Sequence, residues 1–187
     1  MQTITQRYTG AAIVLHWLMA ILLVGLFVLG FYMHDLPLSP EKLQLYSWHK
    51  WAGVTAFAFV LIRLTWRLTH RPPALPETMP RLMKLAAHAG HHTLYLLMMV
   101  IPLSGWLMSS AKGFQTVWFG VLPIPDLIDK NKALGDLLQT THMALNLLFL
   151  LTLAGHIGAA LKHHFIDKDD ILIRMLPKRF AATHKEA

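Results

Sequence analysis

Four histidines lie at matched depths in the long apolar stretches of this 187-residue chain. His16 and His49 stand near the starts of the first and second stretches, and His142 and His156 lie fourteen residues apart in the fourth. Histidine is rare inside membrane helices unless it binds a ligand or lines a polar cavity. Because imidazole is also the commonest protein ligand of metals, the pattern indicates two metal centres, one towards each face of a membrane.

The apolar stretches are long enough to cross a bilayer as helices, which takes about 20 residues. They predict four spans, at about residues 11–33, 48–68, 86–110 and 137–161. The second span contains Lys50, Arg63 and Arg67 near its ends, where long basic side chains reach the lipid headgroups. No cleavage motif follows the first stretch before Asp35, so we expect a span rather than a removed signal peptide. The expected fold is an all-α integral membrane four-helix bundle, forming a single domain over residues 1–187.

Composition supports the membrane assignment, since 55% of the residues are hydrophobic and only 14% are charged. The net charge of +7 would suggest nucleic acid in a soluble protein, but here the basic residues follow the positive-inside rule. We therefore expect lipid contact, no nucleic acid, and both termini in the cytoplasm. Five basic residues lie in the two outer loops, and twelve lie at the N-terminus, in the 63–84 connection and in the tail: Arg7, Arg63, Arg67, Arg71, Arg81, Lys84, Lys162, Lys168, Arg174, Lys178, Arg179 and Lys185.

Alternating span directions pair the histidines by depth: His16 with His156 at the cytoplasmic level, and His49 with His142 at the outer level. Fourteen helical residues rise about 21 Å and complete nearly four turns, so His142 and His156 share one helix face. The chain has no cysteine, which excludes thiolate ligands, and two histidines per centre fit b-type haem. Two haems b, stacked across the membrane, are the expected cofactors. One further cytoplasmic-level histidine could replace His16 or His156, the candidates being His88, His91, His92, His163 and His164.

Arginines and glycines accompany these positions. Arg63 lies fourteen residues after His49, on the same helix face, and Arg67 lies one turn further on. Arginine binds carboxylates bidentately, so both are candidate partners of haem propionates, although an interfacial arginine is the alternative. Gly53, Gly155 and Gly158 flank the histidines, either to admit a flat ligand or to pack helices closely.

The loop over residues 112–135 is apolar for a connection between spans. It predicts a helix lying in the outer interface, through Phe114, Val117, Trp118, Phe119 and Val121. All ten acidic residues fall outside the apolar parts of the spans, which disfavours a carboxylate-driven ion transporter.

The chain resembles the bacterial cytochrome b561 family over nearly its whole length. The resemblance rests on ordered motifs in all four spans, "IVLHWLM", "YSWHKWAGV", "LAAHAGHHTLYLLMMVIPLSGWLM" and "QTTHMALNLLFLLTLAGHIGAALKHHF", followed by the tail "DILIRMLPKR". The resemblance implies haem iron ligands in the first, second and fourth spans, and these fall on His16, His49, His142 and His156.

The resemblance also implies electron transfer with the quinone pool of the bacterial inner membrane, and one relative is regarded as a superoxide oxidase. The implied activity is superoxide:ubiquinone oxidoreductase. His91 and His163 are then candidates for the quinone site or for proton exchange. Five outer-side lysines could attract the superoxide anion, namely Lys42, Lys50, Lys112, Lys130 and Lys132. Five acidic residues share that side, so the attraction must be local: Asp35, Glu41, Asp126, Asp129 and Asp136.

Two other functions remain open on the sequence. The same plan resembles the cytochrome b subunits of membrane hydrogenases and formate dehydrogenases, which carry electrons between a partner enzyme and quinone. The short loops offer little docking surface, so a protein partner is possible but not required. A haem-free, histidine-lined metal carrier is the third possibility, which a sharp b-type absorbance band would exclude.

Overall fold

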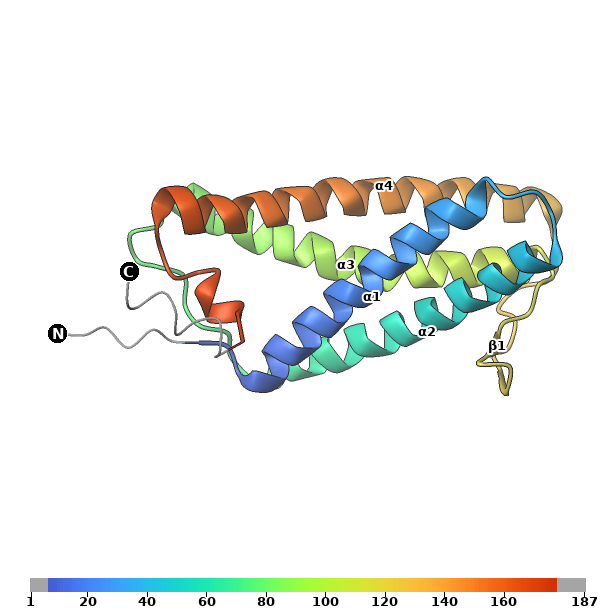
Figure 1. The fold of residues 1–187 in the computed structure, drawn as a ribbon, viewed down its shortest axis with the longest axis horizontal. Coiled ribbons are helices and arrows are strands. Elements are labelled where there is room, and N and C mark those ends of the chain that lie inside the picture. The colour runs from blue at the N-terminus through green and yellow to red at the C-terminus, as the bar shows by residue number, and fades with distance from the viewer. Residues whose placement is uncertain (1–6, 178–187) are drawn as a thin grey trace.

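Four long helices form the body of the molecule in the computed structural model, which describes residues 7–177. They are α1 (Gly10–His34), α2 (Pro40–Thr69), α3 (Arg81–Ala111) and α4 (Lys132–Lys162). All four are long and apolar enough to cross a membrane, and α1 runs obliquely to the others (Figure 1). The predicted all-α four-helix membrane bundle is confirmed.

The helices begin where polar side chains cap their first backbone N–H groups. The side chains of Thr9, Ser39 and Asn131 accept hydrogen bonds from backbone N–H groups in the first turns of α1, α2 and α4. Ser39 is followed by Pro40, whose ring suits the first helical position. Because of this start signal, α2 begins well before the predicted span at residue 48.

A short hairpin replaces the interfacial helix predicted for the loop after α3, so that prediction was wrong. Strands β1 (Val117–Trp118) and β2 (Leu122–Pro123) pair antiparallel, with Trp118 opposite Leu122. The turn between them contains Phe119 and Gly120, both with positive φ, a conformation that no helix contains. Pro123 and Pro125 would also break a helix here.

The two ends of the bundle carry different structures (Figure 1). The hairpin end holds the α1–α2 connection, β1 and β2. The tail end holds the start of α1, the α2–α3 connection, a π-helical turn (η1, His163–Asp167) and a 3-10 turn (η2, Ile173–Met175). The tail is tied down by hydrogen bonds, because Trp17 Nε1 donates to the Met175 carbonyl and Arg174 donates to the Ala74 carbonyl.

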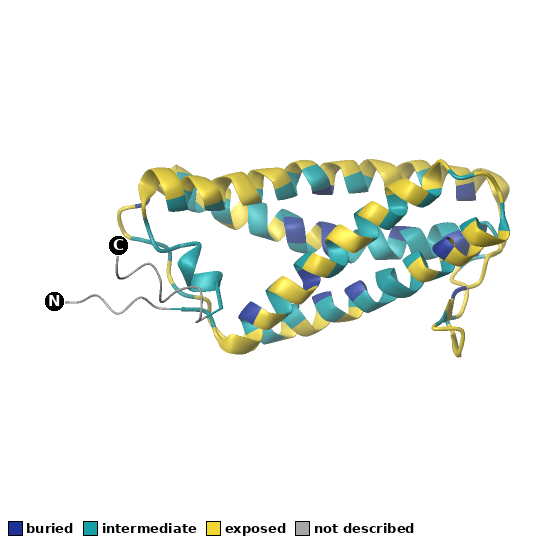
Figure 2. Cartoon of the chain, viewed as in Figure 1, coloured by how far each residue is buried: buried dark blue, intermediate teal, exposed yellow. Residues whose placement is uncertain are grey.

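The buried core is small and lies along the bundle axis, where it draws on all four helices (Figure 2). Its buried side chains are Met19, Val60, Leu94, Leu97, Met98 and Phe149. The outward faces are apolar as well, and Ile21, Val28 and Leu151 are each more than 60% exposed. Exposed aliphatic side chains on this scale fit a surface that lipid tails cover.

Candidate metal centres

His49 from α2 and His142 from α4 line one cavity of about 70 Å³ at the hairpin end of the bundle. All four helices contribute to its wall, which is otherwise almost entirely apolar. Gly53 lies in the same wall, and a Cβ atom added there would meet nothing within 4 Å. The two histidines therefore face an apolar space that reaches the α2 backbone.

The ring of His142 is held in a defined orientation by α3. Its Nδ1 lies 2.8 Å from Ser104 Oγ and 3.1 Å from the Ile101 carbonyl oxygen. A carbonyl only accepts hydrogen bonds, so this contact requires a proton on Nδ1 and leaves the Nε2 lone pair for a metal. Metal-ligating histidines characteristically donate their second N–H in this way.

The His49 ring, unlike that of His142, is not held by a hydrogen bond at Nδ1. Its Nδ1 is buried and has no hydrogen-bond partner within residues 7–177. An unpaired buried polar atom is destabilising unless a ligand or other partner compensates. The orphaned nitrogen and the neighbouring cavity together fit a histidine whose ring serves a bound group.

Two glycines that the sequence did not single out lie behind these rings. A Cβ added at Gly30 would lie 3.4 Å from His49 Cε1, and one at Gly105 would lie 3.2 Å from His142 Cε1. Because Gly30 of α1 and Gly105 of α3 have no side chain, the His49 ring can lie close to α1 and the His142 ring close to α3. By contrast, the Cβ positions of Gly53, Gly155 and Gly158 contact nothing, so these glycines do not serve close helix packing.

A second histidine cluster lies at the tail end, where α1, α3 and α4 bring His16, His91 and His156 together. The ring centres of His16 and His156 are 6.3 Å apart, and those of His91 and His156 are 5.4 Å apart. Two imidazoles that shared one metal ion would have ring centres roughly 6 Å apart, because each metal–nitrogen bond would be about 2 Å. The predicted pair of His16 with His156 meets this spacing.

Arginine side chains from α2 reach the tail-end cluster. Arg63 donates a hydrogen bond of 2.9 Å to His16 Nδ1, and Arg63 and Arg67 both lie 5.6 Å from the Tyr95 ring centre. Since a guanidinium only donates, His16 Nδ1 must accept, which puts the ring proton on Nε2. Binding of iron through Nε2 therefore requires Arg63 to leave His16, which would free the guanidinium for a carboxylate.

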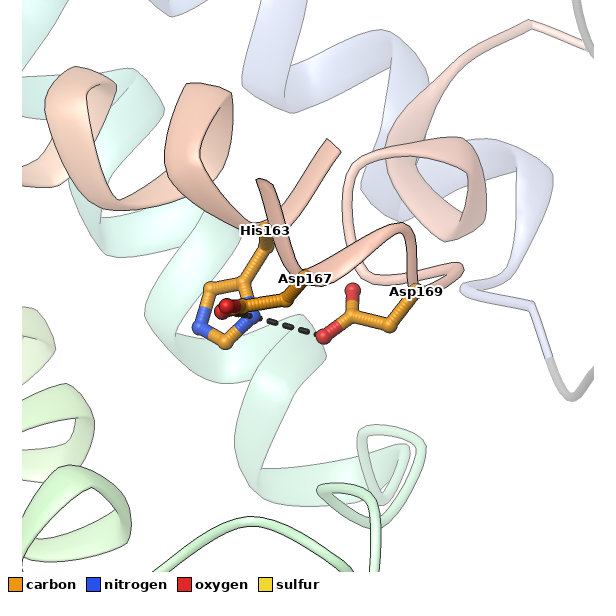
Figure 3. Close-up of side chains that lie close together, drawn as sticks. All are labelled: His163, Asp167 and Asp169. Atoms are coloured by element: carbon orange, nitrogen blue, oxygen red, sulfur yellow. Dashed lines mark hydrogen bonds and ion pairs between the residues drawn. The ribbon is translucent and has the colours of Figure 1, made fainter. Parts of the chain in front are cut away.

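His163 lies beside two carboxylates in the turn after α4, and Figure 3 shows its contact with Asp169. Its Nδ1 lies 2.6 Å from Asp169 and 3.2 Å from Asp167, and its side chain is only 12% exposed. Lys162 also pairs with Asp167, at 2.6 Å. These groups form an ion-pair cluster that fixes the turn after α4, and the quinone or proton role of His163 stays a prediction.

The match to known proteins covers almost the entire chain. A family model described as prokaryotic cytochrome b561 matches residues 7–178. The chain belongs to this family. It is 38% identical over 181 residues to cytochrome b561 homolog 2 of Escherichia coli K12, across 92% of this chain and 93% of that protein. It is 28% identical over 183 residues to the probable superoxide oxidase CybB of Yersinia pestis, across 93% and 98%. Cytochrome b561 homolog 1 of E. coli K12 is 27% identical over 179 residues, across 92% and 98%.

Membership in the cytochrome b561 family gives the two clusters their context. The protein is a multi-pass bacterial membrane protein and an electron carrier, and its family implies b-type haem. The apolar cavity, the orphaned His49 nitrogen and the defined His142 proton all fit that group. The assignment of the four ligands to two haems stays a prediction.

Proposed function

We propose that this cytochrome b561 is a superoxide:ubiquinone oxidoreductase whose hairpin end faces outward. Two superoxide anions each lose one electron and leave as O₂, while one quinone takes up two electrons and two protons and becomes quinol. His49 with His142, and His16 with His156, would each hold one haem b. Bound haem supplies one-electron redox chemistry at both positions.

The observation that carries this proposal is that Lys50, the residue next to His49, has no carboxylate among the described residues paired with its ammonium group. Its ammonium lies 3.1 to 3.3 Å from three oxygens, Ser109 Oγ and the carbonyls of Phe114 and Gln115. None of these oxygens is charged, and Lys50 forms no ion pair within the described part of the chain. Asp126 interacts electrostatically with Lys50 but does not pair with it, so the positive charge at the hairpin end is only partly offset and would attract a small anion.

Further lysines surround a second hollow at the same end. It is lined by Lys112, Lys130, Lys132 and a single carboxylate, that of Asp136. Asp136 pairs with Lys132 at 3.0 Å and with Lys112 at 3.6 Å, so lysines outnumber the acid. Lys42 instead donates to the carbonyls of His34 and Leu36. This local excess of positive charge supports an anionic donor such as superoxide, and so does the name of the Yersinia relative.

The tail-end cluster supplies groups that a quinone would need. His91 lies beside His156, and a neutral imidazole can relay a proton because one ring nitrogen donates while the other accepts. Arg63, Arg67 and Tyr95 offer donors and an aromatic face in the same place. We propose His91 for proton delivery to the quinone, with His163 as a second exchange group.

Product balance tests the proposed reaction. Purified protein given enzymatically generated superoxide and a soluble ubiquinone should form one quinol for every two O₂ released.

Lys50→Gln keeps a hydrogen-bond donor for the two carbonyls but removes the charge, so the rate of quinol formation should fall several-fold at low salt and less at high salt. Lys84→Gln, at the tail end, is the matched control and should leave the rate unchanged. Quinol formation no faster than in a protein-free control would exclude the proposal and leave an electron carrier for a partner enzyme.

A further inference from the structure

The hairpin-end cavity has two halves that match in register, one from α1 and α2 and the other from α3 and α4. Each half places a histidine against a glycine, His49 against Gly30 and His142 against Gly105. The cavity-lining residues of α1 and α3 precede their glycine by the same seven, four and three positions: Leu23, Leu26 and Phe27, and Met98, Ile101 and Pro102. Lining residues of α2 and α4 follow their histidine by the same four and seven positions: Gly53 and Ala56, and Asn146 and Phe149. The halves can therefore be compared position by position.

The comparison shows that polar side chains stand in only one half. The residue before Gly105 is Ser104, which is only 6% exposed, whereas the residue before Gly30 is Leu29. Asn146, whose side chain donates to the His142 carbonyl at 2.7 Å, corresponds to Gly53. The α3–α4 half thus offers hydrogen-bonding side chains at two positions where the α1–α2 half offers none.

This difference decides how each histidine ring is held. Ser104 Oγ donates to the Ile101 carbonyl at 2.7 Å, so its oxygen is free to accept from His142 Nδ1 at 2.8 Å. His142 Nδ1 also lies 3.1 Å from the Ile101 carbonyl oxygen. In the other half, His49 Nδ1 is buried and bonds to no group in the described part of the chain.

A histidine whose second ring nitrogen donates a hydrogen bond is the better metal ligand. The bond fixes the tautomer and the direction of the ring, and it makes the remaining nitrogen more basic. His142 has this support, while His49 has only the packing of its ring against α1.

We infer that His142 is the firmly held ligand of the hairpin-end centre and His49 the exchangeable one, with Ser104 as the positioning residue that makes the difference. The inference rests on the proposed haem pairs and deepens the proposed function. A small neutral nitrogen donor such as imidazole replaces the His49 side chain but not that of His142. The exchangeable ligand is also the one beside Lys50, on the side where the proposed function expects an anion to arrive.

Haem content after removal of either ligand tests the difference. His49→Gly, expressed and purified with imidazole, should retain two haems per chain, because His142 still directs its ring and imidazole fills the space that the substitution opens. His142→Gly should retain one haem under the same conditions, since the remaining His49 ring is not held. Each variant is the matched control of the other, because both remove one imidazole from the same cavity.

Two further substitutions change the support of the ring and leave all four histidines in place. Ser104→Ala should speed the transfer of the hairpin-end haem to apomyoglobin by about tenfold, since loss of such a partner weakens a metal site by roughly 10- to 100-fold. Ser104→Thr, which keeps the hydroxyl, should restore the rate. Leu29→Ser, which adds a hydroxyl at the corresponding position of α1, should slow the transfer. Ser47→Ala is the control and should leave the rate unchanged, because the exposed Ser47 hydroxyl donates to the Leu43 carbonyl of its own helix.

Equal haem contents in the two glycine variants, or retention of two haems in His142→Gly alone, would overturn the inference. So would a Ser104→Ala variant whose hairpin-end haem transfers no faster, and this result decides even if the glycine variants fail to fold. Loss of the tail-end spectrum in either glycine variant would refute the proposed haem pairs and the inference with them. The expected haem contents in a protein without superoxide activity would uphold the inference and refute only the proposed donor.

Discussion

His142→Ala is expected to reduce the haem content of the purified protein from two haems per chain to one. The remaining haem should have the spectrum of the tail-end centre. Alanine removes the nitrogen that faces the cavity, and His49, whose Nδ1 already lacks a partner, would be left as a single ligand. Haem stoichiometry by the pyridine haemochrome method, together with reduced-minus-oxidised spectra, measures the loss.

The matched control for this experiment is His92→Ala. His92 is exposed, and its Nδ1 contacts the His88 carbonyl of the same helix, so its loss should leave both haems in place. His156→Ala should remove the other haem and leave the hairpin-end spectrum. Two unchanged haems in His142→Ala would mean that the hairpin-end pair is assigned to the wrong residues.

The second large effect concerns the tail end, where two histidines compete for one role. His16→Ala should lose the tail-end haem, and His91→Ala should keep both haems while slowing quinone reduction. The spacing carries this expectation, because the His16–His156 rings are 6.3 Å apart and the His91–His156 rings only 5.4 Å. Two rings that bracket one metal ion need roughly 6 Å.

The readouts separate ligand loss from loss of proton delivery. Haem stoichiometry shows whether a haem ligand has been lost, and the rate of quinone reduction shows whether proton delivery has slowed. One haem in His91→Ala together with two haems in His16→Ala would mean that His91 is the haem ligand and that His16 is not. That result would select the alternative in which another cytoplasmic-level histidine replaces His16.

The sequence predicted the features that depend on pattern along the chain. Four apolar stretches became four helices. Arg63, which was singled out because it lies fourteen residues after His49, contacts His16, and its propionate role stays a prediction. Helix ends were less accurate, because α2 begins at its Ser39–Pro40 start signal rather than where the apolar stretch begins. The family followed from motifs that carry both the histidines and their neighbours.

Features that depend on contacts between helices were beyond the sequence. Ser104, Gly30 and Gly105 have no chemistry of their own that marks them, and they matter only because α1 and α3 place them against His49 and His142. The hairpin was misread as a helix because its aromatic residues suggested an interfacial face. The positive φ angles of Phe119 and Gly120 form a tight turn there, which is incompatible with a right-handed helix.

Stopped-flow mixing of the oxidised protein with a superoxide pulse, with and without ubiquinone, tests the central claim most directly. We predict reduction of the b-type bands at a rate close to the diffusion limit, followed by reoxidation only when quinone is present. Slow reduction that shows no saturation, or reoxidation that does not depend on quinone, would contradict a superoxide:ubiquinone oxidoreductase.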